Sequence, residues 1–394
     1  MGRMGMREVA ITGIGVVGPH GVGLAGVLDG RFVFSAWPDS ASPPHAESLI
    51  ASVGDYPRTR YFSERALRLM DKPMMLASFA AGAALEDAGY GDGEAPEDCA
   101  TLLGTARSEQ TSVHKFSLPL LQGRPERINP AEFPLVARNI ACGQMAIRFG
   151  LRGPSSVLAS GPLASLQAVT RAAGLIRSGR AKVALAGGVE ALSRFALRFC
   201  RDYYGDAALA GRPAFFGERG GGLIPSEGAC MLVLEDAEHA AARGARVYAR
   251  LGGWHAGRLG RGDAVQSLLD GWRRAADMAP ALLLPGAGGA GRAHERLETL
   301  ALRRWQAEGA AQPSRLLAAR ALAGEGESWS GALQVALAAA SLARRHAPAT
   351  PDVAADADPA LARAAAGGTL PDDAAALVLG NDAAGAFCAL GLRR

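Results

Sequence analysis

A sharp turn at residues 160–162 has the setting of a catalytic nucleophile but carries no reactive side chain at its tip. The run Ser155–Ala159 is typical of a short strand, and an apolar-periodic helix follows the turn. A strand that turns directly into a helix presents its turn residue at the helix N-terminus, where free N–H groups and the helix dipole stabilise negative charge. A nucleophile at such a turn gains acidity and exposure. Here the turn reads Ser160-Gly161-Pro162, and proline has no nucleophilic atom.

Four other residues are candidates for catalysis, each with a plainer alternative. Ser160 lies two positions from the tip, and the sequence places no His beside it. His294 lies at the start of an expected helix, where a solvated helix-end position is the alternative. Glu325 could act as an acid or base, or have a structural role. Cys142 lies in an apolar helical context that is typical of a small core residue.

The sequence predicts no cofactor and no metal ion. The glycine-rich run PGAGGAGR at 285–292 resembles a phosphate-binding loop, but it lacks the GK[ST] ending of that motif. The five cysteines are scattered, and no pair has the spacing of a metal site, so we expect reduced thiols in a cytoplasmic protein.

Buried strands that alternate with helices must position these residues. We expect strands at 8–17, 99–105, 155–159, 182–188, 230–236, 246–253, 281–284, 314–319, 375–380 and 387–393. We expect helices at 62–88 with a break at residues 71–73, and at 136–149, 165–178, 236–243, 265–278, 294–309 and 331–345. Residues 106–135 are predicted to be less regular, and 348–368 weakly structured. The alternation predicts an α/β fold with largely parallel strands.

Composition excludes several classes of function. The chain has 394 residues, of which 49% are hydrophobic, and a formal net charge of +4. Because no basic run is interleaved with aromatic residues, we expect no nucleic acid partner. No run of about 18 apolar residues occurs and the N-terminus has no signal pattern, so we expect no membrane association and a cytoplasmic location.

Five stretches in order resemble the β-ketoacyl synthases, the condensing enzymes of fatty acid and polyketide synthesis. They read REVAITGIGVVGPHG, RLMDKPMMLASFAAGAALEDAG, NIACGQMAIRFGLRGPSSVLAS, KVALAGGVEAL and PSEGACMLVLEDAEHAAARGARVYA. The resemblance covers essentially the whole chain. It implies a thiolase-like five-layer αβαβα fold made of two similar halves, residues 1–240 and 241–394, and a dimer.

The resemblance also implies a catalytic Cys and two His residues, and this chain has none of the three. The Cys position falls on Pro162. The first His motif falls on Pro285–Gly289, with Pro285 at the His, and the second falls on Arg320–Glu325, with Glu325 at the His. The family's gate near the C-terminus is reduced to Gly367–Thr369. These positions predict no catalytic residues of the family type.

A ketosynthase-like chain without these groups resembles the chain length factor, the partner subunit of type II polyketide ketosynthases. That resemblance implies a heterodimer with an active ketosynthase, an acyl carrier protein as a further partner, and a role in shaping the acyl-chain tunnel. Phe116, Phe133 and Gln144 are our candidates for tunnel or interface residues, with ordinary core packing as the alternative. In this fold the strand before the turn pairs with its counterpart across the two-fold axis, because an open edge would invite aggregation.

One departure from that class affects the pathway. Chain length factors of aromatic polyketide systems typically carry Gln where the Cys was, whereas this chain carries Pro162. A more divergent pathway, such as polyene or aryl polyene synthesis, accounts for the lack of Gln at least as well as an aromatic polyketide pathway does. Two alternatives stay open: a repurposed thiolase-fold acyltransferase or condensing-type enzyme that uses Ser160, His294 or Glu325, and a homodimeric scaffold that holds a carrier protein.

Overall fold

Two mixed sheets and three layers of helices build the molecule. The computed structural model describes residues 7–30, 34–38, 45, 48–91, 95–107, 110–260, 262–286, 288–309 and 314–394. The strand order in the first sheet is β6 (Ser155–Leu158), β5 (Ala100–Gly104), β7 (Val183–Glu190), β8 (Gly228–Asp236) and β1 (Val9–Gly18). In the second sheet it is β11 (Arg315–Leu316), β10 (Leu282–Leu284), β14 (Ala375–Asn381), β15 (Ala386–Arg393) and β9 (Ala249–Arg258). The two sheets join where Val9–Ile11 of β1 pairs with Ala249–Leu251 of β9.

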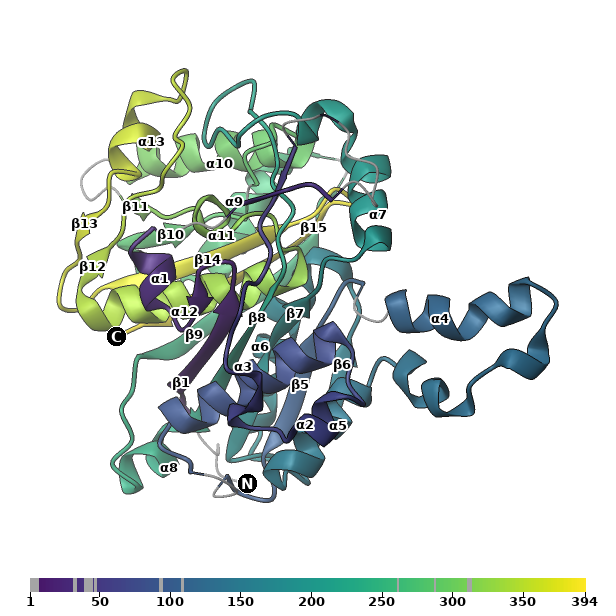
Figure 1. Cartoon of the computed structure of the whole chain (residues 1–394). Coiled ribbons are helices and arrows are strands. Elements are labelled where there is room, and N and C mark those ends of the chain that lie inside the picture. The colour runs from purple at the N-terminus through teal and green to yellow at the C-terminus, as the bar shows by residue number, and fades with distance from the viewer. Residues whose placement is uncertain are drawn as a thin grey trace.

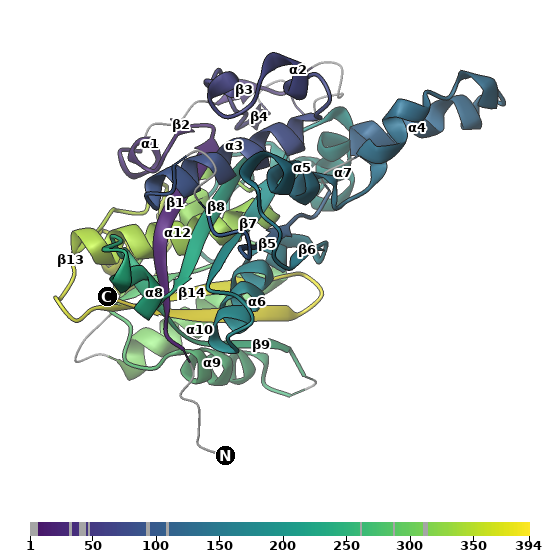
Figure 2. The ribbon, with the colours of Figure 1, turned by 90° about the horizontal axis from the view of Figure 1, so that it is seen from below.

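The central layer between the sheets consists of α6 (Ala164–Arg177) and α12 (Ser328–Arg344), which contact each other (Figures 1 and 2). A helix that is apolar on every side belongs in such a buried layer. Accordingly, α12 is buried from Ser328 to Leu342. On the outside of the first sheet lie α3 (Lys72–Asp87) and α5 (Ile140–Phe149), and on the outside of the second lie α9 (Ala264–Ala275) and α10 (Ala293–Glu308). The five-layer αβαβα fold is therefore confirmed.

Glycine permits the close approach of α3 to β1. A Cβ atom added to Gly15 would lie 2.0 Å from the backbone oxygen of Ala80, and one added to Gly13 would lie 2.2 Å from that of Ala84. Neither separation is compatible with a side chain. The opening strand resembled the family in this stretch, and its glycines set the distance between the first two layers.

Several smaller elements complete the described chain. They are β2 (Gly21–Val22), α1 (Ala25–Leu28), β3 (Ser35–Ala36), β4 (Leu49–Ile50), α2 (Glu64–Leu67), α4 (Gln110–Leu121), α7 (Arg194–Tyr204), α8 (Ala237–Ala242), α11 (Ala319–Ala323), β12 (His346–Ala347), α13 (Pro359–Ala364) and β13 (Gly368–Thr369). None of the helices within the described ranges is both long and apolar enough to cross a membrane.

The structure corrects three expectations. The strands are not largely parallel, because β1, β7 and β8 pair antiparallel, as do β9, β14 and β15. The segment 106–135 is not irregular, since α4 lies within it. The segment 348–368 contains the short helix α13, which begins at an Asp358 cap. The division of the chain at residue 240 stays a prediction.

An arm made of α4 and the turns after it extends away from the layers (Figures 1 and 2). The chain returns through 3-10 helices at Pro125–Arg127 and Pro130–Val136 to reach α5. Pro119 inside α4 and Pro130 and Pro134 in the return made this segment look irregular in the sequence. The arm lies on the same side of the molecule as β6, the last strand of its sheet.

Candidate functional site

A cavity of about 280 Å³ lies where the turn before α6 meets α7, α10 and the segment before α12. Four residues that the sequence singled out line this cavity: Pro162, His294, Arg320 and Glu325. They come from three separate stretches of the chain. The fold therefore brings together the positions at which the family resemblance placed the nucleophilic Cys and the second His motif.

Pro162 opens the helix of the central layer without offering a reactive group. Gly161 has a φ of +71°, which glycine adopts without strain, and a 3-10 turn at Gly161–Leu163 leads into α6. Proline is well suited to a first helical turn because its missing N–H has no partner to lose there. The same property removes an N–H donor that could stabilise an oxyanion. The turn keeps its shape but has neither a nucleophile nor a donor at its tip.

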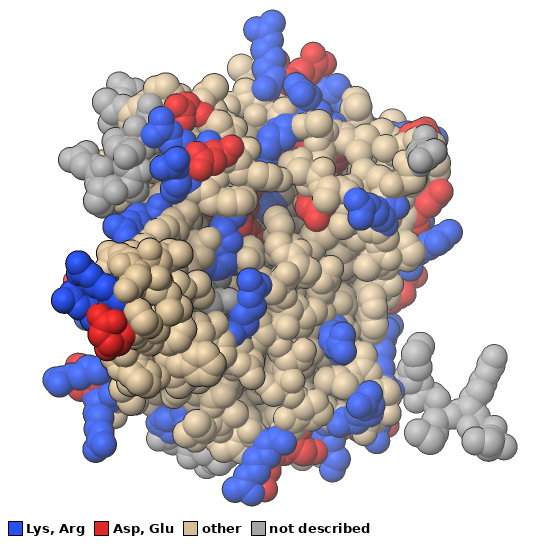
Figure 3. Space-filling model, turned by 90° about the vertical axis from the view of Figure 1, so that its right-hand side faces the viewer, with Lys and Arg blue, Asp and Glu red and all other residues tan. Residues whose placement is uncertain are grey.

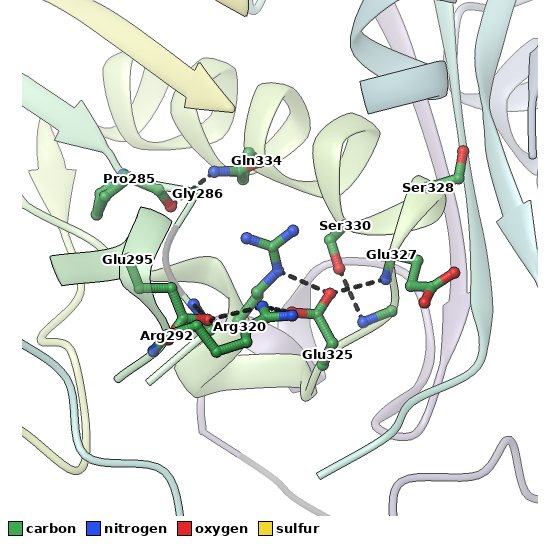
Figure 4. Close-up of polar contacts among 12 residues, drawn as sticks. Pro285, Gly286, Arg292, Glu295, Arg320, Glu325, Glu327, Ser328, Ser330 and Gln334 are labelled. Atoms are coloured by element: carbon green, nitrogen blue, oxygen red, sulfur yellow. Dashed lines mark hydrogen bonds and ion pairs between the residues drawn. The ribbon is translucent and has the colours of Figure 1, made fainter. Parts of the chain in front are cut away.

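Paired charges occupy the position of the second His motif (Figure 4). The Arg320 Nε donates to Glu325 Oε1 at 3.0 Å, and the backbone N–H of Glu327 donates to the same oxygen at 3.0 Å. The Arg320 and Glu325 side chains are only 7% and 3% exposed. Arg292 Nη2 lies 3.6 Å from Glu325 Oε2 and also donates to Glu295 Oε1 at 2.7 Å. Glu325 is thus held in an ion-pair network rather than presented as a free acid or base.

Pro285, which the resemblance aligns with the first His, is held through its backbone carbonyl by a side-chain amide. Its carbonyl accepts from Gln334 Nε2 at 2.8 Å, and the same amide nitrogen donates to Leu284 and Leu379 carbonyls at 3.1 Å (Figure 4). The neighbouring Gly286 N–H donates to Glu298 Oε1 at 3.0 Å. Ala287, within the predicted motif, lies outside the described residues. Pro285 does not line the cavity and contributes no side-chain donor to it.

His294 faces the cavity from the first turn of α10 and is partly buried, so the solvated alternative is wrong. Burial lowers its pKa from 6.5 to about 4, and the guanidinium groups of Arg292 and Arg320 lower it further than Glu295 and Glu325 raise it. The imidazole is therefore neutral at physiological pH.

A second charged group at the cavity was not found from the sequence. Arg107 forms an ion pair with Glu327 and lies over the ring of Phe199 at 4.0 Å from its centre. The Tyr204 hydroxyl donates to the same Glu327 at 3.1 Å. Burial raises the pKa of Tyr204. Arg107 follows β5 in a segment predicted to be irregular, and α7, which carries Phe199 and Tyr204, was not predicted at all.

The remaining sequence candidates lie outside the cavity. Ser160 is exposed, and its hydroxyl donates to Gln167 Oε1 at 2.6 Å rather than to a base. Cys142 is buried in α5, and burial raises its pKa to about 11, as expected for a core thiol. The Gly367–Thr369 segment leads into β13, away from the cavity. Across the ranges that the structure describes, no group of His, Cys, Asp and Glu is placed to hold a metal ion.

The three tunnel or interface candidates do not line this cavity either. Phe116 of α4 and Phe133 of the return segment pack against each other with ring centres 5.6 Å apart, and Phe133 is 62% exposed. Gln144 lies partly buried on α5. The structure therefore brings two of the three together on the arm, and their role stays a prediction.

Comparisons with known proteins agree with the fold. The model of the beta-ketoacyl synthase N-terminal domain matches residues 6–240. The chain is 28% identical over 269 residues to 3-oxoacyl-[acyl-carrier-protein] synthase 2 of Synechocystis, a match that covers 64% of each chain. It is 31% identical over 266 residues to a putative polyketide beta-ketoacyl synthase 1 of Streptomyces halstedii, covering 63% of each.

Among solved structures, the ishigamide ketosynthase/chain length factor is similar over 98% of this chain and 99% of that one, with a TM-score of 0.85 and 22% identity. At this identity the likeness shows the fold. The family model matches more than half of the 394-residue chain. The chain belongs to the beta-ketoacyl synthase family.

Proposed function

We propose that this chain is a non-catalytic ketosynthase-like subunit, a chain length factor, that pairs with an active β-ketoacyl synthase and shapes its acyl-chain tunnel in type II polyketide synthesis. The observation that carries the proposal is the cavity itself. Pro162 lines it where a nucleophile would be, and the buried Glu325 is already bound by Arg320. An ionised carboxylate has no N–H or O–H to donate to a developing enolate, so the site does not support condensation.

Pro162 also bears on the pathway. Proline cannot replace the side-chain amide that the aromatic systems typically carry at this position, so a polyene or aryl polyene pathway fits at least as well. Ser160 offers little support for a repurposed acyltransferase, because its hydroxyl donates to Gln167 and it does not line the cavity.

The side of the molecule that carries β6 and the arm supports a partner subunit. β6 ends its sheet, pairing only with β5 among the described strands, and an open edge of this kind is a template for another strand. Large apolar side chains are exposed nearby: Leu121 is 81% exposed, Phe133 62% and Ile147 80%. Figure 3 shows this side with few charged side chains near its centre. An obligate interface here would bury about 2,000 Å² or more.

An acyl carrier protein is the second proposed partner. The Synechocystis relative is named for an acyl-carrier-protein substrate, and the ketosynthase of a heterodimer would receive its chains from such a carrier. In this arrangement Phe116 and Phe133, on the arm, and Gln144, on α5, lie at or across the subunit interface.

Co-expression with the ketosynthase encoded nearest its own gene tests the proposal. We expect a one-to-one heterodimer that is stable through purification, measured by native mass spectrometry. A Leu121→Asp variant on the arm should weaken the complex, since it places a charge in an apolar interface. Leu300→Asp, at a 51% exposed position on α10, is the matched control and should leave the complex intact. A homodimer that ignores the ketosynthase would contradict the proposal.

A further inference from the structure

The cavity at Pro162 contains a guanidinium group, that of Arg320, with unpartnered donors. Arg320 is only 7% exposed, and its Nε donates a hydrogen bond to Glu325. Its two terminal nitrogens have no partner among the residues that the structure describes, and Figure 4 draws a contact only to Nε. A guanidinium fork presents parallel N–H donors that match a carboxylate. A donor pair that faces a cavity and has no protein partner favours a ligand that satisfies it.

Each carboxylate at the cavity has at least one hydrogen-bonded oxygen, although Glu325 Oε2 has no hydrogen bond to a described residue and lies 3.6 Å from Arg292 Nη2. Glu325 accepts from Arg320 and a backbone N–H, and Glu327 accepts from Arg107 and Tyr204. Asp382 accepts from the backbone N–H groups of residues 384 and 386. The guanidinium fork is therefore the open charged group, and an anion suits it better than a cation.

An aromatic surface forms another wall of the cavity. Phe199 and Tyr203 of α7 stack with ring centres 5.2 Å apart and an interplanar angle of 18°. Both line the cavity, and they are 38% and 51% exposed. Arg107 lies over the Phe199 ring at 4.0 Å and Tyr203 stacks on it, so the parts of the two rings that remain exposed offer the apolar contact to a planar body. The volume of about 280 Å³ is just below the range of about 300–1,000 Å³ that is usual for small-molecule sites, so the cavity suits a small ligand.

We propose that this cavity binds a small planar carboxylate without reacting with it, the carboxylate accepting from the terminal nitrogens of Arg320 and the flat body lying against Phe199 and Tyr203. This goes beyond the proposed subunit role, because it assigns the site a ligand of its own. It does not depend on which protein pairs with the chain.

Three nearly isosteric probes separate the possible ligand charges: benzoate, benzamide and benzamidine. Binding is measured by calorimetry on the purified chain and on its co-purified complex. We expect benzoate to bind, benzamide to bind at least about tenfold more weakly, and benzamidine more weakly still. Equal affinity for the three probes would overturn the proposal, as would no benzoate binding at about 10 mM.

Three variants test whether benzoate binds in this cavity. Arg320→Lys keeps the charge beside Glu325 but loses the fork, and should weaken benzoate binding about tenfold. Phe199→Leu should weaken it a few-fold by removing the aromatic surface. Arg315→Lys, an equally conservative change outside the cavity, is the matched control and should leave affinity unchanged.

If Arg320→Lys fails to fold, the double variant Arg320→Gln with Glu325→Gln removes both partners and leaves no unpaired buried charge. It too should lose benzoate binding. Retained affinity in either folded variant would refute the site. The native mass measured on the same samples keeps this outcome separate from the proposed pairing, because an intact heterodimer without benzoate binding contradicts only this inference.

Discussion

The Arg320–Glu325 pair should stabilise the fold strongly through its coupling, and a double-mutant cycle measures this. The two side chains are 7% and 3% exposed and lie 3.0 Å apart, so solvent screens them little. Arg320→Met leaves a buried carboxylate held by one backbone N–H, with Arg292 3.6 Å away. Loss of one partner of such a pair costs about 3–5 kcal/mol of unfolding free energy.

The double variant should recover most of that loss. Arg320→Met with Glu325→Gln removes both charges, yet the Gln oxygen can still accept from the Glu327 N–H. We expect it to be destabilised by about 1 kcal/mol or less. With the loss of about 3–5 kcal/mol for Arg320→Met, and whatever the Glu325→Gln single variant loses, this gives a coupling energy of at least about 2 kcal/mol. The assay is urea unfolding followed by tryptophan fluorescence, with comparison limited to variants whose denaturant slope is unchanged.

A surface pair provides the matched control. Arg198 and Asp202 on α7 lie 3.1 Å apart, a similar distance, but they are 72% and 61% exposed. Their cycle, Arg198→Met with Asp202→Asn, should give a coupling of about 0.3–0.5 kcal/mol. If the buried pair couples by less than about 1 kcal/mol, or no more than this control, the reasoning from burial is refuted.

Three further predictions concern the turn, the cavity and the close approach of the layers. Pro162→Cys should give a thiol that iodoacetamide modifies but no carbon–carbon bond formation, because the family resemblance assigns the two His positions to Pro285 and Glu325. Condensation above background in a radiolabel assay would contradict this. The pKa of His294 is about 4 in the folded chain and 6.5 ordinarily, so the unfolded chain binds a proton more readily and the free energy of unfolding falls as pH drops from about 6.5 to 4. His294→Gln should flatten this dependence of stability on pH. An NMR titration midpoint near 6.5 for His294 would argue against the prediction. Gly15→Ala should abolish soluble expression because its Cβ would lie 2.0 Å from the Ala80 oxygen, whereas Gly174→Ala in α6, with open space around it, should stabilise the chain by about 0.5–1 kcal/mol in thermal unfolding.

The layers of the fold were largely predictable because buried strands and amphipathic helices leave a periodic signal. The expected strand at 8–17 is β1, and the helix at 265–278 is α9. Strand direction was not predictable in this way, since short apolar runs read alike in parallel and antiparallel pairs. The helix α4 was missed because a proline inside it, Pro119, normally predicts a break.

The sequence predicted some residues of the cavity and missed others. Pro162, Arg320 and Glu325 were found because motif positions in the family resemblance pointed to them, and the cavity contains all three. Arg107 and Tyr204 carry no motif, and they reach the cavity only through long-range packing of α7 against the segment after β5. His294 was placed correctly on α10, but its lowered pKa depends on burial and on the nearby charges of Arg292 and Arg320, which no local pattern reveals.

Given the proposed non-catalytic role, the buried ion pairs would also make a return to catalysis difficult in evolution. A chain of this kind would need a Cys at residue 162 and His at residues 285 and 325 before any condensation could be selected. Glu325→His alone leaves Arg320 and Arg292 facing each other without their shared carboxylate, so that single step lowers stability without a gain in activity. The ion-pair network therefore acts against this one step, at residue 325, because the folding free energy opposes it.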